Sequence, residues 1–398
     1  MKYKKTKIGS IPDDWEIAKI GQIGEVVTGS TPSTKKAEYY GGTVPFITPS
    51  DLDGTKLVNK TERYLTDKGV QVSRPIPQNS VCITCIASIG KACIAPQKSV
   101  TNQQINSILP NDKFDSHYLY YFITNNQERL KSLAGSTTVP IVNKSSFEQF
   151  EIICPPIREQ NKIAEILFIV DADIEKTDAI VKETQQLKKG MMLDLFKLDD
   201  FPLKPLSRLT EEDRPITYGV VKPGDLDEKG VLFIRSGDIQ SGKIMLKNLR
   251  TISKSISNVY KRTILKGGEI LISLVGYPGE VAIVPNELIG ANIARQAGMI
   301  ALQDKETVPF IMYYLMSPTG KSKLLYEQIG SAQQVINLAN LKKIKIPIVP
   351  KSIQNKIVST LKELDAKVDN EKNYKSELEQ LKKGLSQVLL TGKVRVKV

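Results

Sequence analysis

The chain has 398 residues, 40% of them hydrophobic and 25% charged, a composition typical of an ordinary globular protein. Its formal net charge of +13 favours a polyanionic partner, most simply nucleic acid. No apolar run approaches the length of a membrane span, and the lysine-rich start lacks the apolar segment of a signal peptide, so we expect a cytoplasmic protein.

Residues 1–155 are predicted to form a first globular unit of mixed helices and strands. Short apolar runs bounded by turn residues indicate strands, and a longer apolar stretch near the end of the unit indicates a helix. In chain order we expect a strand-like alternation at 17–27, a strand at 44–48, a hairpin of 81–86 with 92–95, a helix at 118–133, and a return through a strand within 139–153.

Residues 156–198 predict one long helix. Its apolar side chains recur every three or four residues, in a narrow seam with a mean period near 3.5 that is typical of a coiled coil. Pro155 and Pro156 stand at its start, where a missing N–H costs little, and no proline or glycine interrupts it before Gly190. The alternative is a surface helix packed only on its own domain, which the narrow seam disfavours.

This arrangement occurs twice. The segment QNKI at 160–163 recurs at 354–357, and LKKG at 187–190 recurs at 381–384, both 194 residues downstream, so the copies of the helix align without a gap. Residues 199–350 therefore predict a second globular unit, and residues 351–398 a second long helix with a tail. The side chains expected to pair the two helices are Ile163, Leu167, Val170, Ile174, Leu187, Ile357, Leu361, Leu364, Val368 and Leu381.

The predicted fold class is α+β. Two similar mixed α/β domains are separated by two long antiparallel coiled-coil helices, and the whole has a pseudo-twofold internal repeat. The scaffold repeats while the contents of the loops diverge, which we expect if the loops of each half read something different.

No catalytic or metal-binding constellation is found in the sequence. Cys82 and Cys85 have the spacing of a metal-binding pair, but the repeat places leucines opposite them, so we predict packed thiols and no metal. His117 is the only histidine and lies opposite Phe310, which indicates a structural role. A phosphate-binding glycine loop is also missing. We therefore expect a protein that recognises a partner and is not an enzyme.

Basic residues gather in the second half of the chain. Residues 231–266 contain eight of them against one acid, Asp238, whereas the matching stretch of the first half is nearly balanced. Such a run can simply be a charged surface that faces solvent. We favour the alternative, a surface that follows the DNA phosphates. Lys243 and Lys247 are the members of this run that we add to the candidate DNA contacts.

The sequence resembles the specificity (S) subunit of type I restriction-modification enzymes over nearly its whole length. The best marks are the PPIREQ run at 155–160 that opens the first long helix, the ITYGVVKPG segment at 216–224, and the IPDDWE start at 11–16. The second copy departs from the helix-opening pattern, because Ile353 stands where the first copy has Glu159.

The resemblance implies two target recognition domains, each reading one part of a split site in double-stranded DNA. It also implies two modification subunits that use S-adenosylmethionine to methylate adenine, and restriction subunits that use ATP and magnesium; this chain itself would bind no cofactor. The alternative is a coiled-coil adaptor or scaffold without sequence-specific DNA readout. A sequence-independent RNA binder would need exposed aromatic residues for stacking, and an aromatic content of 6% offers few.

Base readout is predicted to fall on loops of matched position but different content. Arginine can bind guanine and glutamine adenine through paired hydrogen bonds, each worth roughly 1–3 kcal/mol of discrimination. The target sequence itself is not predicted. The candidates are Ser30, Thr31, Thr48, Ser50, Gln103, Gln104, Thr137 and Thr138 in the first half, and Tyr218, Lys222, Arg235, Ser236, Arg295, Gln296, Gln333 and Gln334 in the second.

Overall fold

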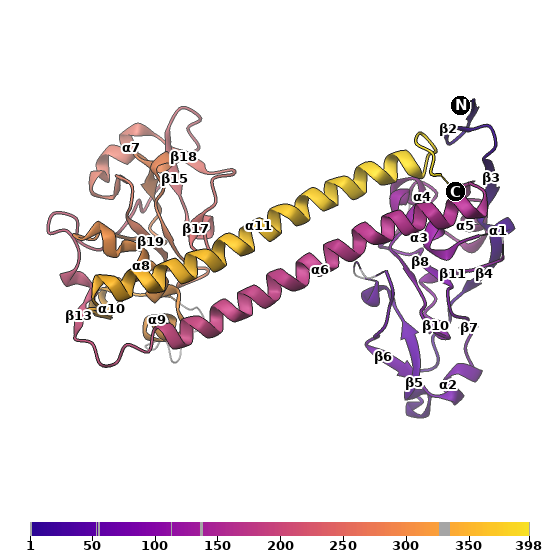
Figure 1. The fold of residues 1–398 in the computed structure, drawn as a ribbon, viewed down its shortest axis with the longest axis horizontal. Helices are drawn as coiled ribbons and strands as arrows, with labels where there is room; N and C mark the ends of the chain where they lie inside the picture. The colour runs from indigo at the N-terminus through magenta and orange to yellow at the C-terminus, as the bar shows by residue number, and fades with distance from the viewer. Residues whose placement is uncertain are drawn as a thin grey trace. The chain divides into compact units, whose positions relative to one another are not determined.

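The computed structural model describes residues 2–52, 54, 56–112, 114–135, 138–325 and 335–397. The chain forms two compact units, one made of Met1–Thr177 with Asn373–Val398 and the other of Asp178–Lys372 (Figure 1). Each unit consists of a globular part and one half of each of two long helices, α6 (Ile157–Leu195) and α11 (Lys351–Leu389).

The first unit is built on two four-stranded sheets. One has the order β4 (Gly24–Thr28), β11 (Ile105–Pro110), β8 (Val81–Thr84), β9 (Ala92–Ile94), and the other β6 (Arg63–Leu65), β5 (Tyr40–Ile47), β10 (Ser99–Thr101), β7 (Pro75–Ile76). Strand β1 (Tyr3–Thr6) pairs with β2 (Gly9–Pro12), and β3 (Glu16–Lys19) with β12 (Glu151–Cys154). Its shorter helices are α1 (Ile20–Ile23), α2 (Asp67–Gln71), α3 (Ser116–Asn125), α4 (Gln127–Lys131) and α5 (Lys144–Glu148).

The second unit repeats this plan. A four-stranded sheet has the order β14 (Thr217–Tyr218), β22 (Ala297–Ile300), β19 (Ile270–Ser273), β20 (Val281–Ile283), and a three-stranded sheet the order β18 (Arg250–Ile252), β15 (Val231–Ile234), β21 (Asn292–Ile293). Strand β13 (Leu203–Pro205) pairs with β23 (Lys345–Pro347), and β16 (Ile239–Gln240) with β17 (Lys243–Ile244). The remaining helices are α7 (Lys254–Val259), α8 (Val308–Met316), α9 (Pro318–Leu325) and α10 (Leu338–Lys343).

The repeat extends to the backbone of single turns. In the β8–β9 hairpin Gly90 has φ +89° and donates its N–H to Thr84 at 2.9 Å. In the β19–β20 hairpin Gly279 has φ +89° and donates its N–H to Ser273 at 2.9 Å. A side chain at either glycine would be strained in this left-handed conformation. The two halves therefore share a fold, and the predicted internal repeat is confirmed.

Two predicted elements of the first unit were wrong in detail. The strand predicted at 17–27 is interrupted by α1, whose first turn is closed by a hydrogen bond from the Lys19 N–H to the Gln22 side chain. The helix predicted at 118–133 breaks at Asn126, whose side chain donates to the Phe122 carbonyl. The return through a strand predicted within 139–153 is found as β12, which follows the short helix α5 and its cap Asn143.

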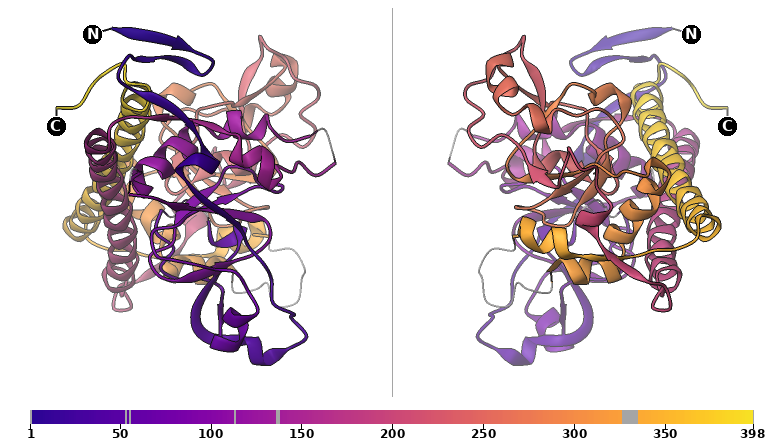
Figure 2. Two further views of the ribbon diagram at one scale, coloured as in Figure 1. Left: turned by 90° about the vertical axis from the view of Figure 1, so that its right-hand side faces the viewer. Right: turned by 90° about the vertical axis from the view of Figure 1, so that its left-hand side faces the viewer.

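In each unit the two long helices run antiparallel and side by side along one flank (Figures 1 and 2). Ile163 and Leu167 of α6 enter the core of the first unit together with Leu389 of α11. Ile357 and Leu361 of α11 enter the core of the second unit with Met192 of α6. Val170 and Val368 are also buried, and Ile174 and Leu364 are half-buried, so these positions lie on the inner faces of the helices as predicted.

Leu187 and Leu381 were assigned to the seam wrongly, because they are 55% and 51% exposed. The inner positions of both helices alternate steps of four and three residues along their whole length, which is the 3.5-residue repeat of a coiled coil. This repeat continues by a step of four from Thr184 to Lys188 in α6 and from Leu378 to Lys382 in α11, so the leucines one position earlier lie outside it.

The thiols are packed within the units. Cys82, Cys85 and Cys93 are buried and Cys154 is half-buried, all as free cysteines. Burial raises the pKa of the Cys85 and Cys154 thiols to about 12. Among the helices within the described ranges, none is both long and apolar enough to cross a membrane.

Candidate nucleic-acid interface

In the first unit one pair of parallel strands gathers the predicted loops at a single edge. Strands β5 and β10 pair in parallel with Thr101 opposite Ile47, so the loops that follow them start side by side. The Asn102 N–H donates to the Ile47 carbonyl at 3.1 Å, which fixes the loop after β10 beside the loop after β5. Six candidates lie in loops at this edge: Ser30, Thr31, Thr48, Ser50, Gln103 and Gln104.

Gly29 allows the loop after β4 to join this edge. A Cβ atom at Gly29 would lie 2.2 Å from the Asn102 carbonyl oxygen, so no other residue fits there without a shift of the backbone. The next residue, Ser30, donates its N–H to the Thr101 carbonyl at 2.8 Å. The hydroxyl of Thr31 then donates to the side-chain oxygen of Gln103 at 2.5 Å, and both side chains are exposed.

Thr48 is held inside the edge and does not face solvent. It is 8% exposed, and its hydroxyl donates to a carboxylate oxygen of Asp51 at 2.7 Å. Ser50, which is exposed, lies 2.8 Å from the Thr48 hydroxyl. Thr48 therefore stabilises the turn that presents Ser50. The Thr-x-x-Asp spacing, a capping pattern visible in the sequence, could have predicted this role.

Arg74 is a residue of this edge that the sequence reasoning missed. Its N–H donates to the Ser30 hydroxyl at 3.1 Å, and its exposed guanidinium donates to the Thr28 carbonyl at 3.0 Å. A cation thus lies beside the candidate base contacts. Thr138 is exposed and its side chain makes no hydrogen bond to this edge among the described residues, and Thr137 lies outside them.

The second unit builds the same edge from β15 and β21. These strands also pair in parallel, with Ile293 opposite Ile234, and the Ala294 N–H donates to the Ile234 carbonyl at 2.9 Å. Gly219 repeats the role of Gly29, because a Cβ atom there would lie 1.8 Å from the Ile293 carbonyl oxygen. The edge brings together Tyr218, Lys222, Arg235, Ser236, Arg295 and Gln296, whereas Gln333 and Gln334 lie outside the described residues.

The two arginines of this edge differ in what they already bind. Arg235 donates to both carboxylate oxygens of Asp238, at 3.1 and 2.9 Å, and this hydrogen bonding raises the pKa of Arg235. Its position corresponds to Thr48 and that of Asp238 to Asp51, so Arg235 also stabilises a turn. Arg295 is exposed, and its guanidinium makes no hydrogen bond or ion pair within the part of the chain that the structure describes.

Matched backbone bonds show which loop residues correspond. Cys85 donates its N–H to the Gln104 carbonyl at 2.8 Å, and Leu274 donates to the Gln296 carbonyl at the same distance. Gln104 therefore corresponds to Gln296, and its neighbour Gln103 corresponds to Arg295. One scaffold position thus carries an exposed amide in the first unit and, in the second, an exposed guanidinium that has no partner among the described residues.

Three members of the basic segment make side-chain bonds that hold the second unit together. Lys243 forms an ion pair with Asp369 of α11, Arg235 binds Asp238, and Arg250 donates to the Gly224 carbonyl at 2.8 Å. Lys247 is exposed and has no side-chain partner among the described residues. Lys243 is therefore a weaker candidate for phosphate binding than Lys247.

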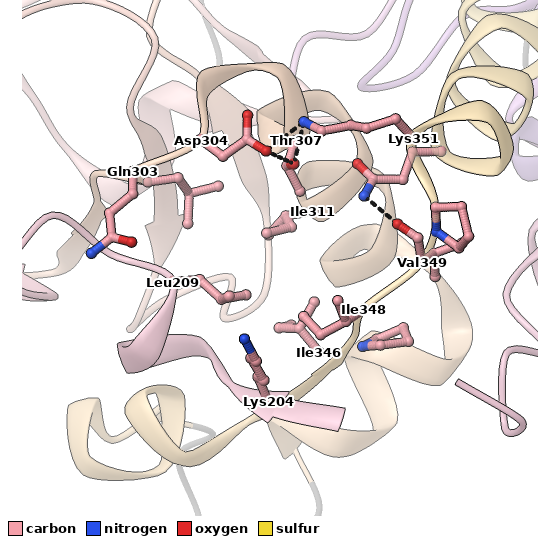
Figure 3. A pocket seen from close by; sticks show the side chains of 14 residues that line it. Lys204, Leu209, Gln303, Asp304, Thr307, Ile311, Ile346, Ile348, Val349 and Lys351 are labelled. Carbon is pink, nitrogen blue, oxygen red and sulfur yellow. Dashed lines mark hydrogen bonds and ion pairs between the residues drawn. The ribbon is translucent and has the colours of Figure 1, made fainter. Parts of the chain in front are cut away.

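A cavity of about 350 Å³ lies in the second unit, where β23 leads into α11 (Figure 3). Its walls are mainly apolar, with Leu209, Ile346 and Ile348 among them, and Lys351 at its rim binds Asp304 at 2.5 Å. In the same lining the Thr307 hydroxyl donates to Asp304 at 2.9 Å and accepts from Lys351 at 2.9 Å, so these three side chains bind one another at the junction of β23 and α11. The described residues contain no group of three or more His, Cys, Asp or Glu side chains that could hold a metal ion.

Comparison with known proteins gives one family. Residues 12–183 and 212–380 match the type I restriction modification DNA specificity domain. The MjaIX specificity subunit of Methanocaldococcus jannaschii, a type I restriction enzyme subunit, is 29% identical, and the match covers 99% of this chain and 96% of that protein. The EcoBI specificity subunit of Escherichia coli is 25% identical over 91% of this chain and 81% of its own length.

Solved structures agree in fold. The crystal structure of a type I restriction-modification S subunit from M. genitalium has a TM-score of 0.60 and 18% identity, covering 95% of this chain and 96% of that one. A chain from a study of complex assembly in a type I system has a TM-score of 0.61 and 14% identity, covering 96% of this chain and 99% of that one. The order of a domain, a long helix, a second domain and a second long helix is therefore shared.

Proposed function

The chain belongs to the family of type I restriction-modification DNA specificity proteins, and on that basis we propose how its two units divide the recognition of DNA. It is the DNA-recognition subunit of a restriction-modification system and has no catalytic role of its own. It binds double-stranded DNA sequence-specifically and directs the modification and restriction subunits to the target. Each unit reads one half of a split site, with a spacer between the halves that neither unit reads.

The observation that supports this division is the shared position of Gln103 and Arg295. The same parallel strand pair presents both side chains, each at the exposed edge of its unit. Glutamine offers a donor and an acceptor that suit adenine, whereas arginine offers two donors that suit guanine. A scaffold that repeats while its exposed side chains differ suits the reading of two different sequences.

The partners follow from the pseudo-twofold repeat. A chain with two similar units offers the same surface twice, so it suits two copies of one modification subunit. S-adenosylmethionine, ATP and magnesium are assigned to the partner subunits and none of them to this chain. The exposed leucines of the long helices, Leu187 and Leu381, stand at equivalent positions and offer such a repeated contact.

Exchanging one globular unit tests the division. Residues 199–350 are replaced by those of a relative, and the methylated sites of cells that express the complex are mapped by sequencing. One half-site should change while the other half-site stays. A change in both halves would show that the units do not read independently. The purified complex should also bind its mapped site more tightly than a scrambled site at moderate salt, since phosphate contacts alone do not discriminate between sequences.

A further inference from the structure

Tyr277 is an exposed aromatic residue at the tip of the β19–β20 turn. Its side chain is 74% exposed. The turn that carries it is held by two backbone hydrogen bonds, from Gly279 to Ser273 at 2.9 Å and from Ser273 to Glu280 at 2.8 Å. Pro278 follows the tyrosine directly and limits the backbone further. The ring is thus presented on a constrained loop, so little backbone freedom is lost when it binds.

The turn lies at the same edge as the candidate base contacts. Leu274, where the turn begins, donates its N–H to the Gln296 carbonyl at 2.8 Å. Gly276 approaches the 3₁₀ turn after β15, because a Cβ atom there would lie 3.8 Å from the Ser236 hydroxyl. Tyr277 therefore stands beside two of the three loops that read DNA in the proposed function.

The first unit has the same turn without the ring. Gly90 matches Gly279 in φ and in its hydrogen bond, which places Ser88 at the position of Tyr277. Ser88 is exposed, so the position faces solvent in both units. The fold does not need an aromatic side chain there, since the first unit builds the turn with serine. The ring is therefore available for a contact that only the second unit makes.

We propose that Tyr277 stacks its ring on a DNA base at the half-site read by the second unit, an inference that rests on the proposed function. A protein that opens the base stack at one step leaves a base face that an aromatic ring can cover. Such stacking depends on the ring and not on the hydroxyl, because every base has a π face. Tyr277 thereby makes binding depend on how easily a base step of the target opens. This contribution adds to the hydrogen bonds proposed between Arg295 and a base.

The test uses the complete chain in complex with its modification subunits and duplexes that carry the mapped site. Binding is measured for the wild type, Tyr277→Phe and Tyr277→Ser, the last of which installs the side chain of the first unit. Val259→Ala is the matched control, because Val259 is 79% exposed in the same unit and away from the reading edge in sequence. Adenines of both half-sites, or their neighbours, are replaced one at a time by the fluorescent base 2-aminopurine.

We expect Tyr277→Ser to weaken binding about 5- to 150-fold, the range for one base stacked on an aromatic residue, while Tyr277→Phe and Val259→Ala stay near the wild type. Fluorescence should differ between wild type and Tyr277→Ser at one position of the second half-site only. Equal affinity of Tyr277→Ser and wild type would overturn the inference, as would an equal loss in Tyr277→Phe, which would indicate a bond through the hydroxyl. A wild-type complex that fails to discriminate its site from a scrambled one would instead overturn the proposed function itself.

Discussion

The hydroxyl of Tyr121 lies 2.6 Å from a carboxylate oxygen of Asp171 and donates its proton to that oxygen. The other oxygen of Asp171 binds Lys382 at 2.5 Å. Asp171 on α6 thus contacts the globular part of the first unit through Tyr121 and the helix α11 through Lys382. The second unit has the equivalent arrangement, in which Asp365 of α11 accepts from Tyr313 at 2.7 Å and pairs with Lys188 of α6.

Replacing Asp171 by asparagine should loosen the helices of the first unit. The amide keeps the shape but loses the charge that Tyr121 and Lys382 bind, so we expect the free energy of unfolding to fall by about 1.5–3 kcal/mol. Urea denaturation followed by circular dichroism measures it. Glu165→Gln is the control, because its pair with Lys162 is exposed and should contribute less than about 1 kcal/mol. Equal effects of the two substitutions would contradict a special role for Asp171.

Lys56 makes the stability of the first unit depend on pH. Its ammonium is buried between Tyr121 and Phe168, and this burial lowers the pKa of Lys56 from 10.5 to about 8. Between these two values the unfolded chain binds a proton that the folded chain does not. The free energy of unfolding should therefore rise with pH in this window, by up to about 1.4 kcal/mol per pH unit.

Lys56→Met removes the titrating group and keeps an apolar side chain of similar length. The difference in free energy of unfolding between wild type and Lys56→Met, measured at several pH values from 7 to 11, isolates the contribution of Lys56. That difference should favour the wild type progressively as the pH rises through the window. A difference that does not change with pH would show that Lys56 titrates normally in the folded chain.

Arg395 fixes the C-terminal tail to the first unit. Its guanidinium binds both carboxylate oxygens of Asp14 at 2.8 Å each, and it also binds Glu159, whose side chain is only 4% exposed. Arg395→Met should therefore cost about 3–5 kcal/mol of the free energy of unfolding, because it leaves a buried carboxylate unpaired. The double substitution Glu159→Ile with Arg395→Met should recover most of this loss, since the second unit carries Ile353 at the matching position. If the double variant is as unstable as the single one, the buried charge is not the cause.

Two equivalent glutamines should respond differently to the same substitution. Gln160 donates to the Pro155 carbonyl at 2.8 Å and accepts from the Asp115 N–H at 3.0 Å. Gln354 likewise donates to the Val349 carbonyl at 2.8 Å, but its side-chain oxygen is buried without a hydrogen-bond partner in the described structure. The backbone N–H that corresponds to that of Asp115 belongs to Val308, and it donates to the Lys305 carbonyl in a 3₁₀ turn.

Gln160→Leu should therefore lower the free energy of unfolding by about 1–3 kcal/mol more than Gln354→Leu does. Gln354→Leu costs less because it removes, together with one hydrogen bond, a buried acceptor that has no partner among the described residues. Thermal unfolding of the two variants and the wild type gives the comparison. Similar losses in both would mean that the Gln354 oxygen finds a partner in solution.

Arg295, whose guanidinium has no partner in the described ranges, should have a large effect on specificity. Arg295→Ala should weaken binding to the mapped site by about 5- to 150-fold and binding to a scrambled duplex much less, because a bidentate base contact contributes only at the correct base. Arg235→Ala, at the same edge, should weaken binding to the mapped site and to the scrambled duplex by similar factors, because Arg235 is bound to Asp238 and stabilises a turn. Gel shifts with both duplexes at one salt concentration decide between these outcomes. An equal loss on both duplexes for Arg295→Ala would place Arg295 on a phosphate.

Sequence reasoning was most successful where the repeat constrained it. The equal spacing of QNKI and LKKG predicted two long helices, and α6 and α11 are found within the predicted ranges. The inner positions Leu167 and Leu361 followed from periodicity alone. Leu187 and Leu381 are apolar but lie outside that period, which passes through the neighbouring Lys188 and Lys382.

The loops that carry the candidate DNA contacts could be predicted from the sequence, but the contacts between their side chains could not. Thr31 and Gln103 were both candidates, but nothing in the sequence indicates that their side chains bind each other across 72 positions. That contact depends on the parallel pairing of β5 with β10 and on the close approach at Gly29. Arg235 and Asp238, in contrast, are separated by three residues, and their spacing alone could have indicated a local pair.

The burial of the four cysteines has a practical consequence. With the pKa of the Cys85 and Cys154 thiols near 12, little thiolate forms at neutral pH, and burial limits access to the others. A maleimide spin label should therefore leave the native chain unmodified. Cysteines placed at Ser88 and Lys247, one in each unit, would be the reactive pair. Pulsed electron paramagnetic resonance on such a chain would report the separation of the units, with and without DNA, and no native thiol would have to be removed.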